Sequence, residues 1–168
     1  MTPATDAAIK RLLCECFPPD VEAFTRSRYW HGTGPTYTLI QRDGGDVVGH
    51  VGVVRRTVRC GGRPVEIAGI QSLCVVPRMR VTGLSWALMR EAMAEARRRG
   101  IKFGLLFCVP RLERFYGSLK WVRTDAPMTM DDERGEPVAI PTKNIAMYIQ
   151  LTGEPFPDGP VHLGGRDW

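Results

Sequence analysis

The chain lacks several features that would assign it to a class of protein at once. It has no apolar run long enough to cross a membrane and no signal-peptide pattern, which favours a cytoplasmic location. Its five cysteines show no zinc-ligand spacing, so no metal site is predicted, and Cys74 and Cys108 are expected to be buried free thiols. There is no internal repeat, and the absence of a basic–aromatic pattern argues against a nucleic-acid partner.

The composition is that of an ordinary globular protein, with 43% apolar and 24% charged residues. A length of 168 residues predicts a single domain over residues 1–168, with an irregular tail from about residue 153 that is rich in Pro and Gly. The net charge of +5 fits an anionic partner, such as a polyphosphate cofactor or an acidic carrier protein. Because most basic residues are spread along the chain, the cofactor needs the fewest assumptions.

The most informative stretch runs from Ile67 to Arg99 and belongs to a strand, a turn and a helix. Residues 65–76 form a nearly continuous apolar run rich in β-branched residues, which predicts a central strand buried on both faces and ended by Pro77. Residues 84–99 have apolar positions at helical spacing and arginines in the last turn, which predicts a helix. The turn between them contains Gly83, but neither a Gly-Lys-Ser/Thr nor a GxGxxG sequence.

A strand, a glycine-containing turn and a helix N-terminus together predict an anion site. The first N–H groups of a helix have no intrahelical partner and carry a partial positive charge. Gly83 would let a ligand approach the backbone, Arg80 adds a full charge, and the hydroxyls of Thr82 and Ser85 can donate. An ordinary capped turn would use the same residues, so spacing alone leaves both interpretations open.

The remaining elements are expected from periodicity and turn residues. Thr5 or Asp6 is the expected N-cap of the first helix. Residues 125–142 are polar and rich in proline, which predicts a loop. Helices are expected over residues 6–16, a short segment ending near 25, 84–99 and 110–116, and strands over 36–41, 47–59, 65–76, 102–109, 121–124 and 143–151.

Two motifs resemble those of the GCN5-related N-acetyltransferases (GNAT). Arg80-Val81-Thr82-Gly83-Leu84-Ser85 resembles the family's (Gln/Arg)-x-x-Gly-x-(Gly/Ala) pyrophosphate signature, with Ser85 as a departure. Residues 112–122 resemble the second motif, usually FYxxxGF, although Lys120 stands where Gly is usual and Trp121 where Phe is usual. The resemblance implies an α/β fold with a mixed, mostly antiparallel sheet flanked by helices, in which the strands 65–76 and 102–109 splay apart.

The resemblance also implies acetyl-CoA or another acyl-CoA as co-substrate. Its pantetheine arm would lie in the gap between the splayed strands and bond to the backbone of Leu73 and Val75. By the resemblance, Tyr116 stands at the family's general-acid position. A phenol with a pKa near 10 suits this role, since it can protonate a leaving thiolate. The alternative is a tyrosine that only packs in the core. The implied cofactor-binding residues are Leu73, Cys74, Val75, Arg80, Val81, Thr82, Gly83, Leu84 and Ser85.

The general base is not apparent from the sequence. The family often places Glu on the central strand where Gly69 stands here. Gln71 cannot take a proton but can orient a water that does. His50 is expected to titrate near neutrality, although a lone histidine is more often structural.

Two families that acylate a 2-amino sugar resemble longer stretches of the chain. Residues 24–83 are similar to the nodulation N-acyltransferases, and residues 24–168 to the aminoglycoside 2′-N-acetyltransferases. This implies a small-molecule amine acceptor, although Arg28 and Gln71 stand where the aminoglycoside enzymes have acids, which disfavours a polycation. The alternative for the first loop is a solvated segment with aromatics packed beneath it. The implied acceptor residues are Arg28, Tyr29, Trp30, His31, Asp167 and Trp168.

The resulting hypothesis is an N-acyltransferase that moves an acyl group, acetyl in the first instance, from acyl-CoA to a primary amine of an amino sugar or related metabolite. One alternative is a long-chain acyltransferase fed by an acyl carrier protein, whose acidic surface Arg78, Arg80 and residues 97–99 would face. Another is a non-catalytic acyl-CoA sensor. Many relatives pair, so a homodimer is a further expectation from the resemblance.

Overall fold

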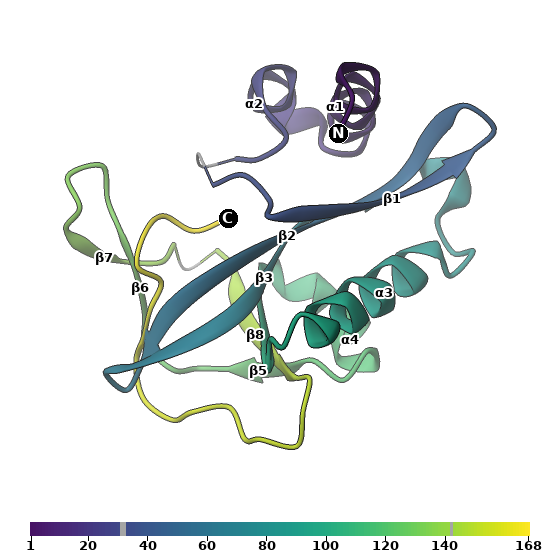
Figure 1. Ribbon diagram of the computed structural model, residues 1–168. Helices are drawn as coiled ribbons and strands as arrows, with labels where there is room; N and C mark the ends of the chain where they lie inside the picture. Colours follow the sequence, from purple (N-terminus) through teal and green to yellow (C-terminus); the bar gives the residue numbers. More distant parts are fainter. Residues whose placement is uncertain (31–32, 142) are drawn as a thin grey trace. The chain divides into compact units, whose positions relative to one another are not determined.

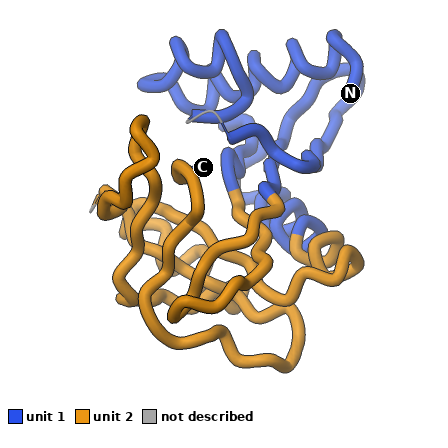
Figure 2. The backbone as a smooth tube through the Cα atoms, turned by 60° about the vertical axis from the view of Figure 1, so that its left-hand side comes forward, with its two compact units in different colours: residues 1–54, 71–92, 168 blue, residues 55–70, 93–167 orange. Residues whose placement is uncertain are grey.

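The computed structural model describes residues 1–30, 33–141 and 143–168 (Figure 1). His31, one of the expected acceptor residues, lies outside the described residues. The chain forms two compact units, of which unit 1 comprises residues 1–54, 71–92 and 168, and unit 2 comprises residues 55–70 and 93–167 (Figure 2). The single domain expected from the length stays a prediction.

Unit 1 begins with the helices α1 (Pro3–Cys16) and α2 (Val21–Arg26), joined by the 3₁₀ turn η1 (Pro18–Asp20). The expected N-cap at Thr5 or Asp6 is wrong, because the Oγ1 of Thr2 accepts from the backbone N–H of Thr5 and caps the helix. Pro3 fits the first helical position, where its missing N–H costs nothing, and Asp6 then lies in the first turn where the helix dipole favours a negative charge.

The strands of unit 1 are β1 (Tyr37–Asp43) and the first part of β2 (Asp46–Cys60), which form an antiparallel hairpin. Thr38 pairs with Gly52 and Ile40 with His50, so the side chains of these positions share one face of the sheet. β3 (Arg63–Val75) runs from unit 2 into unit 1, and the N–H of Val76 donates to Val48 at 3.0 Å.

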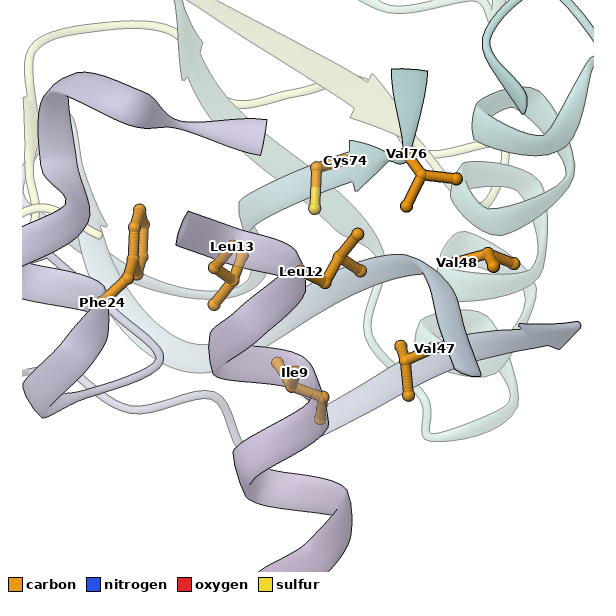
Figure 3. Packing of buried hydrophobic residues seen from close by; sticks show 8 residues of the cluster. All are labelled: Ile9, Leu12, Leu13, Phe24, Val47, Val48, Cys74 and Val76. Carbon is orange, nitrogen blue, oxygen red and sulfur yellow. The ribbon is translucent and has the colours of Figure 1, made fainter. Parts of the chain in front are cut away.

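Helices α1 and α2 bury their apolar faces against these strands (Figure 3). The ring of Phe24 lies 5.5 Å from that of Phe17 and 4.8 Å from that of Trp30, measured between centroids. The cluster of buried residues consists of Ile9, Leu12, Leu13, Phe24, Val47, Val48, Cys74 and Val76. After β3 come the 3₁₀ turn η2 (Pro77–Met79) and helix α3 (Leu84–Arg98), which begins in unit 1.

Unit 2 holds a mixed sheet with the strand order β5-β8-β4-β3-β2-β9-β6-β7. β4 (Phe103–Cys108) runs parallel to β3 from the pair Ile67–Phe103 to the pair Ile70–Leu106. β8 (Ile145–Gln150) lies antiparallel to both β4 and β5 (Val122–Thr124). The expected α/β class with a mixed, mostly antiparallel sheet is confirmed, and the splay of β3 from β4 beyond Ile70 stays a prediction.

Residues 125–142 and the tail contain strands that the sequence analysis missed. β6 (Met128–Asp131) and β7 (Pro137–Ala139) form a hairpin, and β9 (Val161–His162) pairs with both β2 and β6. The Oδ1 of Asp132 accepts from the N–H groups of Arg134 and Glu136 and shapes the turn. Such short segments show no readable alternation, and Pro137 is tolerated because it begins its strand.

The second motif forms the 3₁₀ turn η3 (Pro110–Leu112) and helix α4 (Glu113–Ser118). Side chains pack so closely on β4 at Gly104 that no larger residue fits there unless its neighbours move. A Cβ at this position would lie 2.7 Å from Ile149 and 2.8 Å from Trp121. In the described part of the chain, none of the helices has the length and apolar character needed to span a membrane.

Candidate active site

The turn that links η2 to α3, residues 80–83, has an unusual backbone. Gly83 has a φ of +85°, and a Cβ built on it would meet nothing within 4 Å. Val81 also lies in the left-handed region, with a φ of +64°, and its side chain is fully exposed. A β-branched residue in this conformation is rare, so the turn is held in its shape against a local preference.

The electrostatics of this turn suit an anion. α3 has 15 residues and no acidic residue in its first turn, so nothing offsets the partial charge at its N-terminus. Among the described residues, the N–H groups of positions 81–83 donate to no other backbone group. Thr82 donates its hydroxyl to Met79 at 2.7 Å, so its contribution to a ligand is its N–H group. The turn therefore fits a pyrophosphate.

Arg80 is exposed and is anchored to the end of β3. Its Nε donates to the carbonyl oxygen of Val75 at 3.4 Å, and the Sγ of Cys16 donates to the same oxygen at 3.5 Å. The hydrogen bond with Cys74 lowers the pKa of the Cys16 thiol, and the charge of Arg80 lowers it further. Cys74 and Val75 are buried and Leu73 is half-buried, and the expected contact of this segment with pantetheine stays a prediction.

His50 is completely buried on β2. Its Nδ1 lies 2.9 Å from the carbonyl oxygen of Ser72, a residue with a φ of +54°. A carbonyl can only accept, so Nδ1 carries the proton and Nε2 is left as an acceptor. The pKa of His50 is lowered to about 4, mainly by burial and in part by the charge of Arg28, although the hydrogen bond to Ser72 opposes the shift. The expected titration near neutrality is therefore wrong, because the ring is removed from water.

Gln71 lies on the same face as His50. Its Cγ would be 3.0 Å from a Cβ on Gly52. Gly52 lies two residues after His50 on β2, so both positions point to the same face of the sheet. Its Nε2 donates to the carbonyl oxygen of Thr33 at 3.1 Å. Within the described residues, the Oε1 of Gln71, the Nε2 of His50 and the Oγ of Ser72 are buried without a hydrogen-bond partner. Neither Ser72 nor Thr33 carries a sequence signal for this cluster.

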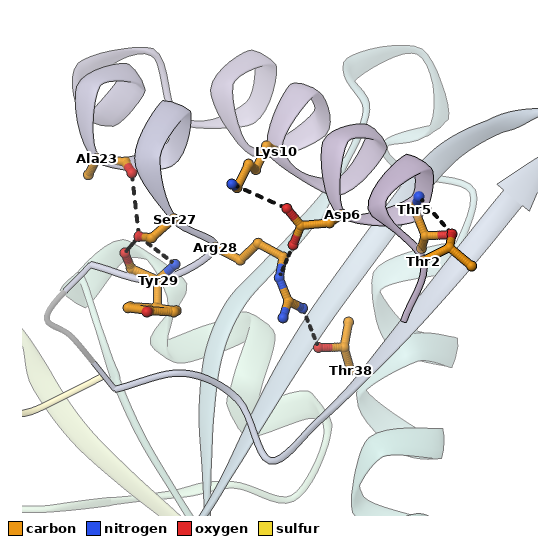
Figure 4. Close-up of polar contacts among 9 residues, drawn as sticks. All are labelled: Thr2, Thr5, Asp6, Lys10, Ala23, Ser27, Arg28, Tyr29 and Thr38. Atoms are coloured by element: carbon orange, nitrogen blue, oxygen red, sulfur yellow. Dashed lines mark hydrogen bonds and ion pairs between the residues drawn. The ribbon is translucent and has the colours of Figure 1, made fainter.

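The expected acceptor residues of the first loop have different surroundings. Arg28 forms an ion pair with Asp6, in which its Nε lies 2.7 Å from Oδ1, and its Nη1 donates to the hydroxyl of Thr38 at 3.4 Å (Figure 4). Trp30 packs edge-on against Phe24 and Phe17, which matches the alternative of an aromatic residue beneath the loop. Tyr29 is half-buried, and its ring would lie 3.3 Å from a Cβ on Gly34.

Tyr116 lies in unit 2, buried in α4. Its ring makes edge contacts with Phe115 at 4.9 Å and with Trp121 at 6.2 Å between centroids. Burial raises the pKa of the phenol above its ordinary value, and Cys108 adds to the shift. The pKa near 10 that the sequence analysis assumed is therefore too low, and Tyr116 is a neutral hydrogen-bond donor at physiological pH.

The end of the chain is held by side chains from the sheet. Arg56 of unit 2 donates from its Nη1 to the carbonyl oxygen of Arg166. Burial lowers the pKa of Arg56, while the charges of Asp167 and Asp131 raise it. Trp168 is 6% exposed and belongs to unit 1. The expected acceptor role of Asp167 and Trp168 stays a prediction.

Comparison with known proteins finds a curated relative that matches part of the chain. Nodulation protein A of Bradyrhizobium elkanii is 28% identical over 95 residues, which are 56% of this chain and 45% of that protein. The chain thus spans less than half the length of this curated relative.

Two solved structures share the fold. One is the GNAT family N-acetyltransferase YhbS of Escherichia coli in complex with CoA, which is 18% identical with a TM-score of 0.63, over 97% of this chain and 86% of that one. The other is a GNAT family acetyltransferase of Brucella melitensis in complex with acetyl-CoA, which is 19% identical with a TM-score of 0.60, over 96% of this chain and 90% of that one. Residues 1–123 match the acetyltransferase (GNAT) domain family, so the chain belongs to that family.

Proposed function

We propose that the protein is an N-acyltransferase that moves an acyl group, acetyl in the first instance, from acyl-CoA to a primary amine of an amino sugar or related small metabolite. The observation that carries the proposal is the conformation of residues 80–83. Among the described residues, the N–H groups of positions 81–83 donate to no other backbone group, and they precede a helix N-terminus with no acidic residue in its first turn. Two structural neighbours hold CoA and acetyl-CoA, which supports acyl-CoA as the donor.

The donor would be held mainly by the backbone. Its pyrophosphate fits the N–H groups of residues 81–85, with the guanidinium of Arg80 adding charge. The pantetheine arm would follow the backbone of Leu73 and Val75, in contact with Cys74 and Leu84. Arg80 reaches Val75 at 3.4 Å, which joins the phosphate site to the strand that would hold the arm.

The reaction needs a neutral amine, a stabilised oxyanion and a protonated leaving group. The amine nitrogen attacks the thioester carbon, the tetrahedral intermediate collapses, and the products are an amide and the free thiol of CoA. Tyr116 would donate its proton to the leaving sulfur, and its raised pKa keeps that proton in place until thiolate forms. His50 cannot store the proton of the amine, because its pKa of about 4 is too low. Gln71 would orient a water that carries this proton away.

The amino sugar is favoured by charge. Arg28 and Gln71 take the places of acids that would bind a polycation, and the chain is similar to nodulation protein A over 95 residues. Asp167, Trp168 and Tyr29 complete the proposed acceptor residues. A cytoplasmic location and a homodimer remain predictions.

The decisive experiment compares two glycines with the same backbone strain. Gly83 and Gly100 have φ values of +85° and +80°, and a Cβ on either would meet nothing within 4 Å. Gly83→Ala and Gly100→Ala should therefore lose similar stability, about 1 kcal/mol each. Only Gly83→Ala should weaken acetyl-CoA binding in calorimetry. Equal affinities for the two variants would contradict the proposed phosphate site.

Turnover is tested by thiol release with glucosamine, a chitooligosaccharide amine, an aminoglycoside and a peptide N-terminus. We expect release with the first two in the presence of acetyl-CoA. Binding of acetyl-CoA without release from any amine would favour a sensor. Binding of no CoA ester, together with a salt-sensitive interaction with an acyl carrier protein, would favour the carrier as donor.

A further inference from the structure

The buried polar atoms of unit 1 include acceptors that nothing in the described chain satisfies. They are the Nε2 of His50 and the Oε1 of Gln71; the hydroxyl of Ser72 is also buried without a partner. His50 is 0% exposed and Gln71 is 3% exposed, so water does not replace the missing partners freely. Buried polar groups in proteins are almost always paired, and such a cluster points to a ligand that supplies the partners.

The hydrogen bonds that these side chains do make fix what they offer. The Ser72 carbonyl takes the Nδ1 proton of His50, so Nε2 presents a lone pair. The Thr33 carbonyl takes a proton from the amide nitrogen of Gln71, so the amide oxygen is the free end. Both groups are therefore acceptors, and both are uncharged. A ligand here must bring N–H or O–H donors.

The charges around the pair disfavour a cation. The charged group that acts on His50 is Arg28, whose guanidinium lowers the pKa of the ring. The carboxylate of Asp6 on α1 forms ion pairs with both Arg28, at 2.7 Å, and Lys10, at 3.2 Å, so it is already shared by two cations (Figure 4).

The other titratable groups packed on this face are thiols. Cys16 comes from α1 and Cys74 from β3, and Cys74 belongs to the same buried cluster as Val48. β1 contributes Thr38 and Ile40 opposite Gly52 and His50, and neither titrates. None of these four side chains carries a carboxylate that could hold an ammonium group.

We infer that His50 and Gln71 form a neutral acceptor pair that binds the amine substrate in its uncharged form, taking one hydrogen bond from the amine and one from a neighbouring hydroxyl or from the amine itself. This inference rests on the proposed function and adds to it the protonation state and the donor pattern of the acceptor. A carboxylate at the same place would instead hold the ammonium form.

The pH dependence of catalysis distinguishes the two cases. If only the free base binds, kcat/KM rises about tenfold per pH unit up to the pKa of the substrate amine, and the break moves when the amine is changed. Glucosamine and cyclohexylamine differ in amine pKa and in hydroxyl content, so they make a suitable pair. A break at one pH for both amines, or a flat profile, would overturn the inference.

Two substitutions at one position sharpen the test. Gln71→Glu should raise kcat/KM below the amine pKa by about tenfold and flatten its slope, because the carboxylate holds the ammonium and takes its proton. Gln71→Met should lower kcat/KM for glucosamine by about tenfold, because it removes the acceptor and keeps the volume. Gln41→Glu, the same change at an exposed position on β1, should leave the profile as it is. A Gln71→Glu profile identical to that of Gln41→Glu would overturn the inference.

The inference and the proposed function fail differently. Acetyl-CoA affinity, measured by calorimetry, should be unchanged in all three variants, and thermal melting shows that each is folded. If no amine releases thiol, calorimetric binding of glucosamine to the CoA-loaded protein above and below the amine pKa still tests the pair. Binding only above that pKa supports the pair while the transfer reaction fails; binding equally at both pH values, or at neither, overturns the pair.

Discussion

Val81 offers a test of whether the turn before α3 is strained. Its φ of +64° places a β-branched residue in the left-handed region, which costs an ordinary L-residue about 1–2 kcal/mol. Its side chain is 106% exposed, so replacing it removes no buried contact. Asn enters this region more readily than Val, and Val81→Asn should therefore stabilise the protein by about 1 kcal/mol.

Glycine provides an independent estimate of the same strain. Val81→Gly relieves the conformation fully but widens the unfolded ensemble, which costs about 0.5–1 kcal/mol. The expected order of stability is therefore Asn, then Gly, then Val at position 81. For a chain of this size, 1 kcal/mol corresponds to a rise in Tm of about 2–4 °C.

The assay is thermal and urea denaturation, with Val21→Asn as the control. Val21 is also exposed, but its φ is −54° in the first turn of α2, so the same substitution should bring no gain there. The reasoning is refuted if both variants at position 81 lower Tm, or if Val21→Asn raises it equally.

Three further predictions concern single buried residues. Tyr116→Phe should lower thiol release from acetyl-CoA by about 10²–10⁴-fold at unchanged acetyl-CoA affinity, and equal rates would exclude Tyr116 as the acid. The pKa of His50 falls from 6.5 to about 4 on folding, so below pH 6.5 the unfolded chain binds a proton that the folded protein does not. The free energy of unfolding should therefore fall by about 3 kcal/mol as the pH drops from 6.5 towards 4. His50→Gln should flatten urea-derived stability over this range. Gly104→Ala should cost about 1–3 kcal/mol in the same assay, because its Cβ would overlap Ile149 and Trp121.

The long elements were predictable because their signals are long. Residues 65–76 are predicted as a buried strand from a nearly continuous apolar run, and β3 is buried from Ile67 to Ser72. The helix predicted over residues 84–99 lies at Leu84–Arg98, and the predicted strand over 102–109 contains β4. Each of these segments carries its own pattern, so neighbouring elements do little to decide its state.

The short strands were not predictable for the opposite reason. β6, β7 and β9 span four, three and two residues, and each depends on a partner for its hydrogen bonds. A segment of that length has the same composition as a loop until its partner is known. The predicted start of α1 was also wrong. The helix begins at Pro3, which is tolerated in the first turn, and Thr2 is therefore the N-cap.

The two halves of the candidate site differ in the same way. The proposed phosphate turn, residues 80–83, would act through backbone groups, so a motif of a few residues with Gly83 in the right place is enough to indicate it. The proposed acceptor pair would act through the side chains of His50 and Gln71, whose free ends are fixed as acceptors by hydrogen bonds to the carbonyl oxygens of Ser72 and Thr33. Sequence could name His50 and Gln71 as candidates, but a histidine's tautomer and pKa are properties of its surroundings. Burial keeps the His50 ring uncharged, and the Ser72 carbonyl oxygen, which accepts from Nδ1, leaves Nε2 as the hydrogen-bond acceptor.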